Sequence, residues 1–247
     1  MKEYNNNVVL ITGASRGLGK ATAIEFAKHK FNIVINYNNS KEQALDLQRK
    51  LEEQYGVRTL LIKCDVSDAK QVEEMKNTIL QEFGRIDVLI NNAGISRDSL
   101  VEDKTVESFN EVLSTNLIGP FNTMQIIGKV MYEHELGSIV NVSSNNAIDA
   151  YYPYSMEYDA SKAGLISLTH NFALLYAPYT RVNAVAPGWI KTDMSAGLDQ
   201  EQIAKEENDI LLKRFAEPEE IAEEIFHMAV ESTYMNNTVI KIDGGSY

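Results

Sequence analysis

Short apolar runs alternate along this chain with longer stretches in which apolar residues recur every three or four positions. The runs are rich in Val, Ile and Leu and are bounded by turn-favouring residues, as expected of parallel strands that are buried on both faces. They occupy residues 8–12, 32–37, 59–64, 88–91, 138–142, 181–185 and 239–242. The pattern therefore predicts seven strands.

The stretches between these runs have the spacing of amphipathic helices. Apolar side chains fall on one helical face at Ala44, Leu47, Leu51 and Tyr55, at Val72, Met75, Ile79 and Phe83, and at Leu165, Leu168, Phe172 and Leu175. Such strand–helix alternation produces right-handed crossovers and a parallel sheet with helices on both faces. We therefore predict an α/β fold in which residues 1–247 form one domain, a doubly wound, seven-stranded parallel sheet of the Rossmann type.

Charge and cysteine content narrow the classes of function. The 247 residues include 35 acids and 23 bases, giving a net charge of −12, so neither nucleic acid nor a membrane surface is an expected partner. The single cysteine, Cys64, has no partner for an internal disulfide, which favours a reducing cytoplasm. No apolar run reaches membrane-spanning length, and the four scattered histidines show no metal-ligand spacing. We expect a soluble, cytoplasmic protein without a metal site.

A glycine-rich turn follows the first predicted strand. It reads Thr12-Gly13-Ala14-Ser15-Arg16-Gly17-Leu18-Gly19 and leads into a predicted helix at residues 20–30. Such a turn lets the backbone approach a pyrophosphate at the start of a helix, although the spacing G-x-x-x-G-x-G differs from the usual G-x-G-x-x-G. A plain tight turn is the alternative interpretation, and the place of the turn after the first buried strand favours a nucleotide.

Five motifs, in order along nearly the whole chain, resemble those of the short-chain dehydrogenase/reductase family. They are the turn at residues 12–19, Asn91-Asn92-Ala93-Gly94, the pair Tyr158 and Lys162, the run Asn183-Ala184-Val185-Ala186-Pro187-Gly188, and Asp243-Gly244-Gly245. Residues 92–98 are most similar to 3-oxoacyl-[acyl-carrier-protein] reductases, which usually have Thr where Ser96 stands. The resemblance implies an NADPH-dependent carbonyl reductase, and a homotetramer.

The resemblance places a catalytic set on Asn116, Ser144, Tyr158 and Lys162. Tyr158 and Lys162 are four residues apart at the start of a predicted helix and share one face. The lysine ammonium is expected to lower the phenol pKa, so that Tyr158 serves as general acid. Ser144 ends the fifth predicted strand, where its hydroxyl can stabilise charge on the substrate oxygen. Asn116 resembles the family asparagine that holds a water beside the lysine. An ordinary surface pair is the alternative for Tyr158 and Lys162.

Two assignments near the catalytic residues have alternatives, the choice of serine and the role of the neighbouring tyrosines. Ser143 is the rival of Ser144, which we prefer because its interval of 14 residues to Tyr158 already slightly exceeds that of the family. Tyr151, Tyr152 and Tyr154 have no lysine four residues later, and they are expected to line the substrate entrance or to pack beside it.

The end of the second predicted strand indicates NADP(H). Enzymes of this architecture that use NAD normally carry an acid there for the ribose 2′-hydroxyl. This chain has Asn36 and no acid between Glu25 and Glu42, whereas Arg16 and Lys41 are placed to reach a 2′-phosphate. A solvated Arg16 is the alternative.

By resemblance, cofactor-binding residues extend over several loops. Around the phosphates and the 2′-position these are Gly13, Ser15, Arg16, Gly17, Leu18, Gly19 and Asn36, and at the adenine Asp65 and Val66. Asn92, Ala93 and Gly94 would pack along the ribose, with Tyr158 and Lys162 beside them, and Pro187, Gly188, Ile190 and Thr192 complete the nicotinamide end.

Two segments around the expected pocket depart from the acyl-carrier-protein reductases. Their docking positions are typically basic, but this chain has Glu133 and Glu135 at one and Tyr179 at the other. Like charges weaken docking of an acidic carrier, unless Lys129, Arg97 or Lys191 supplies the contact. Residues 145–156 are rich in tyrosine and slightly lengthened, which favours a small polar ketone or a sugar. Residues 192–215 resemble the lid that closes over substrate in this family.

Three functions follow in order of preference. The first is an NADPH-dependent carbonyl reductase most like a 3-oxoacyl-thioester reductase, with a small-molecule or acyl-thioester substrate and an acyl carrier protein as a doubtful partner. The second is a sugar, polyol or secondary-alcohol dehydrogenase. The third is a non-catalytic, NADP-binding redox sensor, against which the complete set of Asn116, Ser144, Tyr158 and Lys162 argues.

Overall fold

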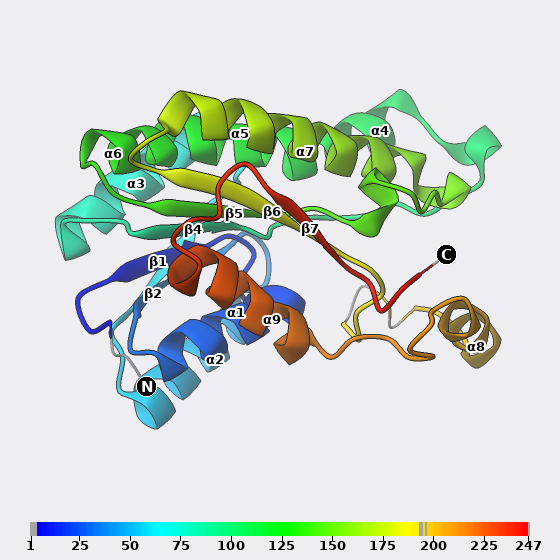
Figure 1. Cartoon of the computed structure of the whole chain (residues 1–247), viewed down its shortest axis with the longest axis horizontal. Helices are drawn as coiled ribbons and strands as arrows, with labels where there is room; N and C mark the ends of the chain where they lie inside the picture. Colours follow the sequence, from blue (N-terminus) through cyan, green and yellow to red (C-terminus); the bar gives the residue numbers. More distant parts are fainter. Residues whose placement is uncertain (1–3, 193–194, 196, 247) are drawn as a thin grey trace.

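In the part of the chain that the computed structural model describes, residues 4–192, 195 and 197–246, seven parallel strands form one sheet. Their order is β3-β2-β1-β4-β5-β6-β7 (Figure 1). The strands are β1 (Val8–Ile11), β2 (Asn32–Tyr37), β3 (Thr59–Lys63), β4 (Val88–Asn91), β5 (Ser138–Val142), β6 (Arg181–Pro187) and β7 (Val239–Ile242). The predicted fold class is therefore confirmed, and the strand bounds differ little from those expected.

Helices cover both faces of this sheet (Figure 1). On one face lie α1 (Gly17–Lys28), α2 (Lys41–Tyr55) and α9 (Pro218–Phe226). On the other lie α3 (Ala69–Phe83), α4 (Val106–Leu113), α5 (Gly119–Thr123), α6 (Lys129–Glu133) and α7 (Met156–Tyr176). The short helix α8 (Gln200–Asn208) lies off the carboxyl end of the sheet. Among the described residues, no helix combines the length and the apolar character that crossing a membrane requires.

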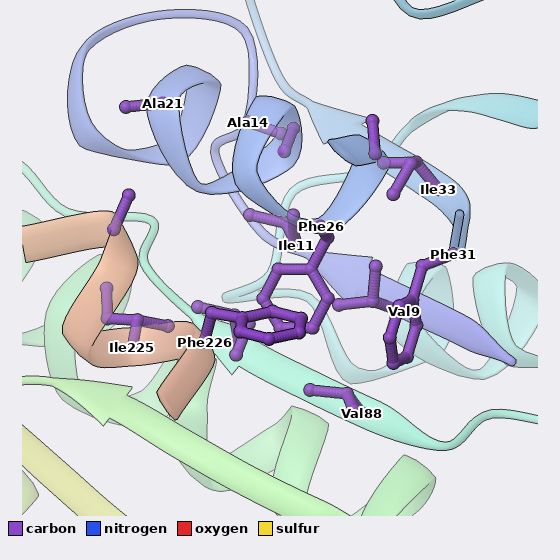
Figure 2. Close-up of a cluster of buried hydrophobic side chains, with 14 of the residues drawn as sticks. Val9, Ile11, Ala14, Ala21, Phe26, Phe31, Ile33, Val88, Ile225 and Phe226 are labelled. Carbon is purple, nitrogen blue, oxygen red and sulfur yellow. The ribbon is translucent and has the colours of Figure 1, made fainter. Parts of the chain in front are cut away.

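The central strands contribute to a separate hydrophobic core on each face, because successive side chains of a strand point to opposite sides. Val9 and Ile11 of β1 pack with Phe26 and Phe226 from the α1 and α9 layer (Figure 2). Val8 and Leu10 belong instead to the core under α3 and α7, with Met75, Ile79, Leu165 and Phe172. Burial on both faces explains why these strands read as continuous apolar runs.

The helices α4, α5 and α6 follow one another directly from Val106 to Glu133. They are joined by two π-helical turns, Ser114–Ile118 and Met124–Gly128. The junctions keep helical backbone angles, so the three helices form one interrupted rod across the sheet (Figure 1). π-Helical turns within α-helices frequently mark functional sites.

The chain reverses its direction of travel across the sheet at β1. From β1 it proceeds to β2 and β3 on one side, and then returns to β4 on the other side of β1 before continuing to β7. The loops that leave the carboxyl ends of β1 and β4 therefore diverge, which opens the crevice where ligands bind in doubly wound sheets. The glycine turn and the residues Asn92–Gly94 both leave the sheet at this crevice.

Candidate active site

The glycine turn after β1 is packed against the loop after β4. Thr12 Oγ1 accepts hydrogen bonds from the backbone N–H groups of Asn92 and Ala93 at 2.9 and 3.0 Å. Asn92 Nδ2 in turn donates to the carbonyls of Thr12 and Gly13. Gly13 has a φ of +61°, and a side chain there would come within 2.9 Å of Ala93 Cα. Glycine is therefore required at this close approach of two backbones.

The N-terminus of α1 has the features of an anion-binding site. Its N-cap, Arg16, makes no side-chain cap, and the first turn holds no acidic residue, so neither feature competes with an anion for the N–H groups and the positive end of the helix dipole. Beside it lies a cavity of about 240 Å³ lined by Ser15, Arg16, Gly17, Lys20, Gln43 and Asp46. A phosphate group fits this combination of helix start and two cations.

Asn36 plays a different part from the one expected of it. Its side chain is buried between two loops, where Oδ1 accepts from Gly13 N at 3.2 Å and Nδ2 donates to Cys64 O at 3.0 Å. Both ends of the amide are thus engaged with backbone. Asn36 therefore fixes the glycine turn, and a contact of this residue with the cofactor stays a prediction.

The other expected cofactor residues lie on loops at the same edge of the sheet. Val66 follows β3 and is held by Asn122, whose Nδ2 donates to its carbonyl at 3.0 Å, while Asp65 accepts from Ser67. Gly188, after β6, donates its N–H to Ile242 O at 3.0 Å. Ile190 pairs with Ala216 in an isolated bridge, and Thr192 lies 3.5 Å from where a side chain on Gly17 would begin. The loop after β6 therefore reaches the phosphate turn.

Asn116 lies in the first π-helical turn and is fully buried. Its Oδ1 accepts from Ile95 N at 2.8 Å, and its Nδ2 donates to Ile95 O at 2.9 Å and to Ser161 Oγ at 3.1 Å. The side chain thus ties the loop after β4 to α7. A side chain on Gly94 would begin 3.4 Å from Asn116 Oδ1 and 3.5 Å from Lys162 Nζ, so the structure brings Asn116 and Lys162 together around Gly94.

Lys162 and Tyr158 lie on the same face of α7. The ammonium of Lys162 is 3% exposed, donates to Val142 O at 2.7 Å and lies 5.4 Å from the centre of the Tyr158 ring. Burial lowers the pKa of Lys162 to about 8 and raises the pKa of Tyr158 to about 12. The expectation that the lysine lowers the phenol pKa is therefore wrong for the chain alone. Removal from water disfavours both charged forms, and for Tyr158 burial outweighs the hydrogen bond with Ser144.

The two neighbouring serines have separate partners. Ser143 Oγ donates to Lys162 O at 3.0 Å and so fastens β5 to α7. Ser144 shares a hydrogen bond with Tyr158, and its Oγ also accepts from Asn146 N at 3.3 Å. Ser144 is thus the serine that reaches the tyrosine.

Two acids flanking Tyr158 were not found from the sequence. Glu157, 1% exposed, receives Lys104 Nζ at 2.8 Å, and the same ammonium donates to Arg97 O. Asp159 accepts from Asn146 Nδ2 at 2.8 Å and from Tyr152 N at 2.9 Å. Each acid fastens the start of α7 to a different loop. Their position next to the tyrosine is the one signal in the sequence, and their partners, 7, 13 and 53 residues away, are visible only in the fold.

The tyrosine-rich segment lies in front of the start of α7. Tyr151 is 78% exposed and Tyr154 47% exposed, while the half-buried Tyr152 meets Tyr154 edge to face at 5.4 Å. Ser99 N donates to Tyr154 O at 3.0 Å, which joins this segment to the loop after β4. The side chains of Tyr151 and Tyr154 are therefore available to a ligand.

The residues compared with carrier-docking positions lie away from the crevice of the same chain. Glu133, Glu135 and Tyr179 come just before β5 and β6, so in a parallel sheet they lie at the amino edge, opposite the crevice. The alternative cations are each paired with a glutamate: Arg97 with Glu111 at 2.7 Å, Lys191 with Glu217 at 2.5 Å and Lys129 with Glu133 at 3.7 Å.

The segment 192–215 lies partly outside the described residues, at positions 193, 194 and 196. What is described includes α8, which begins at a capping box formed by Asp199 and Gln202. Glu206 of α8 accepts from Trp189 Nε1 at 3.0 Å, and the Trp189 ring stacks on Phe215 at 5.4 Å. These contacts hold α8 beside the end of β6.

Comparison with known proteins agrees with this geometry. Residues 13–247 match the family described as enoyl-(acyl carrier protein) reductase. The chain is 41% identical over 240 residues to the 3-oxoacyl-[acyl-carrier-protein] reductase FabG of Thermotoga maritima, covering 96% of both chains. It is 35% identical over 244 residues to the protein of that name from Staphylococcus epidermidis, covering 98% of this chain and 99% of the other.

Solved structures are similar over almost their whole length. A short-chain type dehydrogenase/reductase from Mycobacterium marinum superposes with a TM-score of 0.92 at 31% identity, covering 98% of this chain and 96% of that one. ElxO with NADP bound gives a TM-score of 0.88 at 32% identity, covering 97% and 98%. The resemblance carried by the five motifs is thereby confirmed, and the chain belongs to the short-chain dehydrogenase/reductase family of NAD(P)-dependent oxidoreductases.

Proposed function

We propose that this protein is an NADPH-dependent reductase of 3-oxoacyl thioesters. The observation that carries the proposal is the meeting of Ser144, Tyr158, Lys162 and Asn116 at the carboxyl edge of the sheet, beside the uncapped start of α1. The names of the T. maritima and S. epidermidis relatives support the substrate class. The NADP in the ElxO structure supports the cofactor.

Each catalytic side chain has a role that follows from its surroundings. When bound, NADPH supplies the hydride for the carbonyl carbon. Tyr158, neutral because burial raises its pKa to about 12, gives its phenolic proton to the carbonyl oxygen, and Ser144 donates a hydrogen bond to the same oxygen. Lys162 stabilises the phenolate that results, and Asn116 fixes the loop that carries Gly94 beside the lysine.

A substrate panel followed by NADPH absorbance tests this function. We expect consumption of NADPH with the N-acetylcysteamine thioester of 3-oxobutanoate, and slower reactions with ketoses or, in reverse, with polyols and secondary alcohols. A sugar, polyol or secondary-alcohol dehydrogenase is the second candidate, favoured by the exposed Tyr151 and Tyr154 and by Asn146 close to Ser144. Turnover of polyols alone would select it.

Cofactor choice is expected to depend on Arg16. Because Arg16 and Lys20 line the cavity beside the start of α1, Arg16→Ala should weaken NADPH binding by about tenfold and leave NADH binding nearly unchanged. Calorimetry with both cofactors measures the difference, with Arg58→Ala, an exposed arginine just before β3, as the control. Equal affinity of the parent protein for NADPH and NADH would contradict the assignment.

We expect no preference for a substrate tethered to an acidic carrier. Arg97 and Lys191, both after strands that end at the crevice, are paired with Glu111 and Glu217, so the positive charge of these two side chains is already offset by a neighbouring carboxylate. Glu111→Gln, which releases Arg97, should raise kcat/KM for the carrier-bound thioester by about two- to fivefold at low salt, and the gain should fade as ionic strength rises. The free thioester and the Glu82→Gln variant serve as controls. A strong, salt-sensitive preference in the parent protein would show that other basic residues dock a carrier.

The assembly proposed from the family resemblance is a homotetramer. Its support in this chain is a set of exposed apolar side chains on the α4 to α7 face, namely Val106, Ile118, Leu174 and Leu175, which a second copy would cover. Light scattering at micromolar concentration measures the mass, and a monomer there would contradict the proposal.

We further propose that residues 192–215 act as a lid. We also propose that the protein works in the cytoplasm, where the buried thiol of Cys64 stays reduced.

A further inference from the structure

Asp159, immediately after the proposed catalytic tyrosine, is bound to two parts of the segment in front of it. One carboxylate oxygen accepts from Asn146 Nδ2 at 2.8 Å, and the other accepts from the backbone N–H of Tyr152 at 2.9 Å. Both distances are those of strong hydrogen bonds to a charged acceptor. Asp159 therefore joins α7 to two points of the tyrosine-rich segment, residues 145–156.

The contact with Asn146 decides which way its amide points. An ionised carboxylate only accepts hydrogen bonds, so the Nδ2 group of Asn146 must face Asp159. The Oδ1 atom then faces Ser144 Oγ at 3.4 Å, while the backbone N–H of Asn146 donates to the same hydroxyl at 3.3 Å. Asn145 Oδ1 lies 3.4 Å from it as well. Ser144 Oγ thus donates to Asn146 Oδ1 and accepts from Asn146 N. When a substrate carbonyl binds, the single hydroxyl proton turns to its oxygen, and the N–H contact keeps the hydroxyl in place.

The Ser144 hydroxyl, which Asn146 contacts in this way, is also the partner of Tyr158. Ser144 is buried and shares a hydrogen bond with the phenol. The charged groups that face Tyr158 are Asp159 on its own helix, Asp98 on the loop after β4, and Lys162 one turn along α7. The two carboxylates disfavour the phenolate and so help to keep Tyr158 protonated.

We propose that Asp159 is a positioning residue for the reaction, which acts through Asn146 to hold the Ser144 hydroxyl beside Tyr158 and through Tyr152 to fix the front wall of the site. The proposal rests on the proposed reductase function for its kinetic consequences. A purely structural alternative exists, because Asp159 also lies in the first turn of α7, where an acid favours the helix dipole. The experiment separates the two roles.

The kinetic part uses Asp159→Ala, Asn146→Ala and the double variant with the 3-oxobutanoyl thioester. Each single variant should lower kcat by roughly tenfold with the KM for NADPH within about twofold, because the phosphate end of the crevice is untouched. The double variant should lose no more than the worse single variant, since the two residues act in one chain of contacts. In Asp159→Ala, but not in Asn146→Ala, the alkaline loss of reductase activity should move to lower pH, because an anion beside Tyr158 is gone.

The matched control is Glu107→Ala, which removes an exposed acid from the first turn of α4. Because it removes only a contact with the helix dipole, this variant should lower the melting temperature without altering kcat or the pH profile. Parent-like kcat in Asp159→Ala, or single losses that multiply in the double variant, would overturn the proposal.

A crystal structure of Asp159→Ala supplies a readout that needs no substrate. We expect Asn146 to leave its place against Ser144 and the Ser144 side chain to occupy more than one rotamer. An unchanged Ser144 and Asn146 would overturn the positioning role. A chain inactive on every thioester would instead refute the proposed function, while the crystal structure still decides whether Asp159 holds Ser144.

Discussion

Tyr158→Phe is expected to lower the rate of NADPH oxidation by roughly 10³-fold, which lies within the range for loss of a general acid. The substitution removes only the phenolic oxygen, so the ring and its packing beside Lys162 remain. The fold and the affinity for NADPH should therefore be retained. Single-turnover absorbance with the 3-oxobutanoyl thioester measures the rate, and fluorescence titration measures NADPH binding.

Tyr234→Phe is the control, because Tyr234 is fully exposed and precedes β7, at the amino edge of the sheet and away from the crevice. Its rate should stay within about twofold of the parent rate. If Tyr158→Phe retained a tenth or more of the parent rate, another group would have to provide the proton.

Lys162→Met should abolish most turnover and, at the same time, make the ligand-free protein more stable. The buried ammonium has a pKa of about 8 in the folded chain, against about 10.5 in the unfolded chain. Below pH 8 both states carry the proton, and the folded state bears the whole penalty of burying the charge. Between pH 8 and 10.5 the unfolded state binds more protons, so this penalty shrinks as pH rises.

At pH 7 the stabilisation should be on the order of 2 kcal/mol, after allowance for the lost hydrogen bond to Val142 O. For a chain of this size it corresponds to a rise in Tm of about 4–8 °C. Melting curves of the ligand-free parent and variant from pH 6 to pH 10 measure it. We expect the difference to narrow towards pH 10, and a constant difference would show that the charge of Lys162 is not its cause. Lys129→Met is the control, because Lys129 is an exposed lysine paired with Glu133.

The strands could be predicted from the sequence because both faces of each central strand are buried. β6 is the exception, because the apolar run predicted an end at Val185, whereas the strand continues until Pro187 pairs with Ile242. The first helix also begins earlier than predicted, at Gly17 rather than Lys20, because glycines of the turn already form its first residues.

Local spacing also predicted the residues that meet at the crevice. Tyr158 and Lys162 are four residues apart, so they share a helical face wherever the helix begins. Ser144 follows a strand whose position the apolar pattern predicted. The pKa of Tyr158 was misjudged, because burial depends on every surrounding element and sequence spacing shows only the lysine. The partners of the Asn36 amide and the edge of the sheet that Glu133 reaches could not be predicted for the same reason, because both follow from the fold.

The two π-helical turns have a consequence for how the rod from Val106 to Glu133 tolerates insertion and deletion. Val112 and Met124 are both fully buried, yet 12 residues of uninterrupted α-helix would turn their side chains about 120° apart. The wider turn at Ser114–Ile118 absorbs one surplus residue, which brings the angle back to about 20°. Removing one residue of this turn would leave regular α-helix and keep Val112 and Met124 on the same face. Removing two residues would rotate one half of the rod by about 100° away from the core. The rod can therefore lose a residue at the wide turn without losing its buried face.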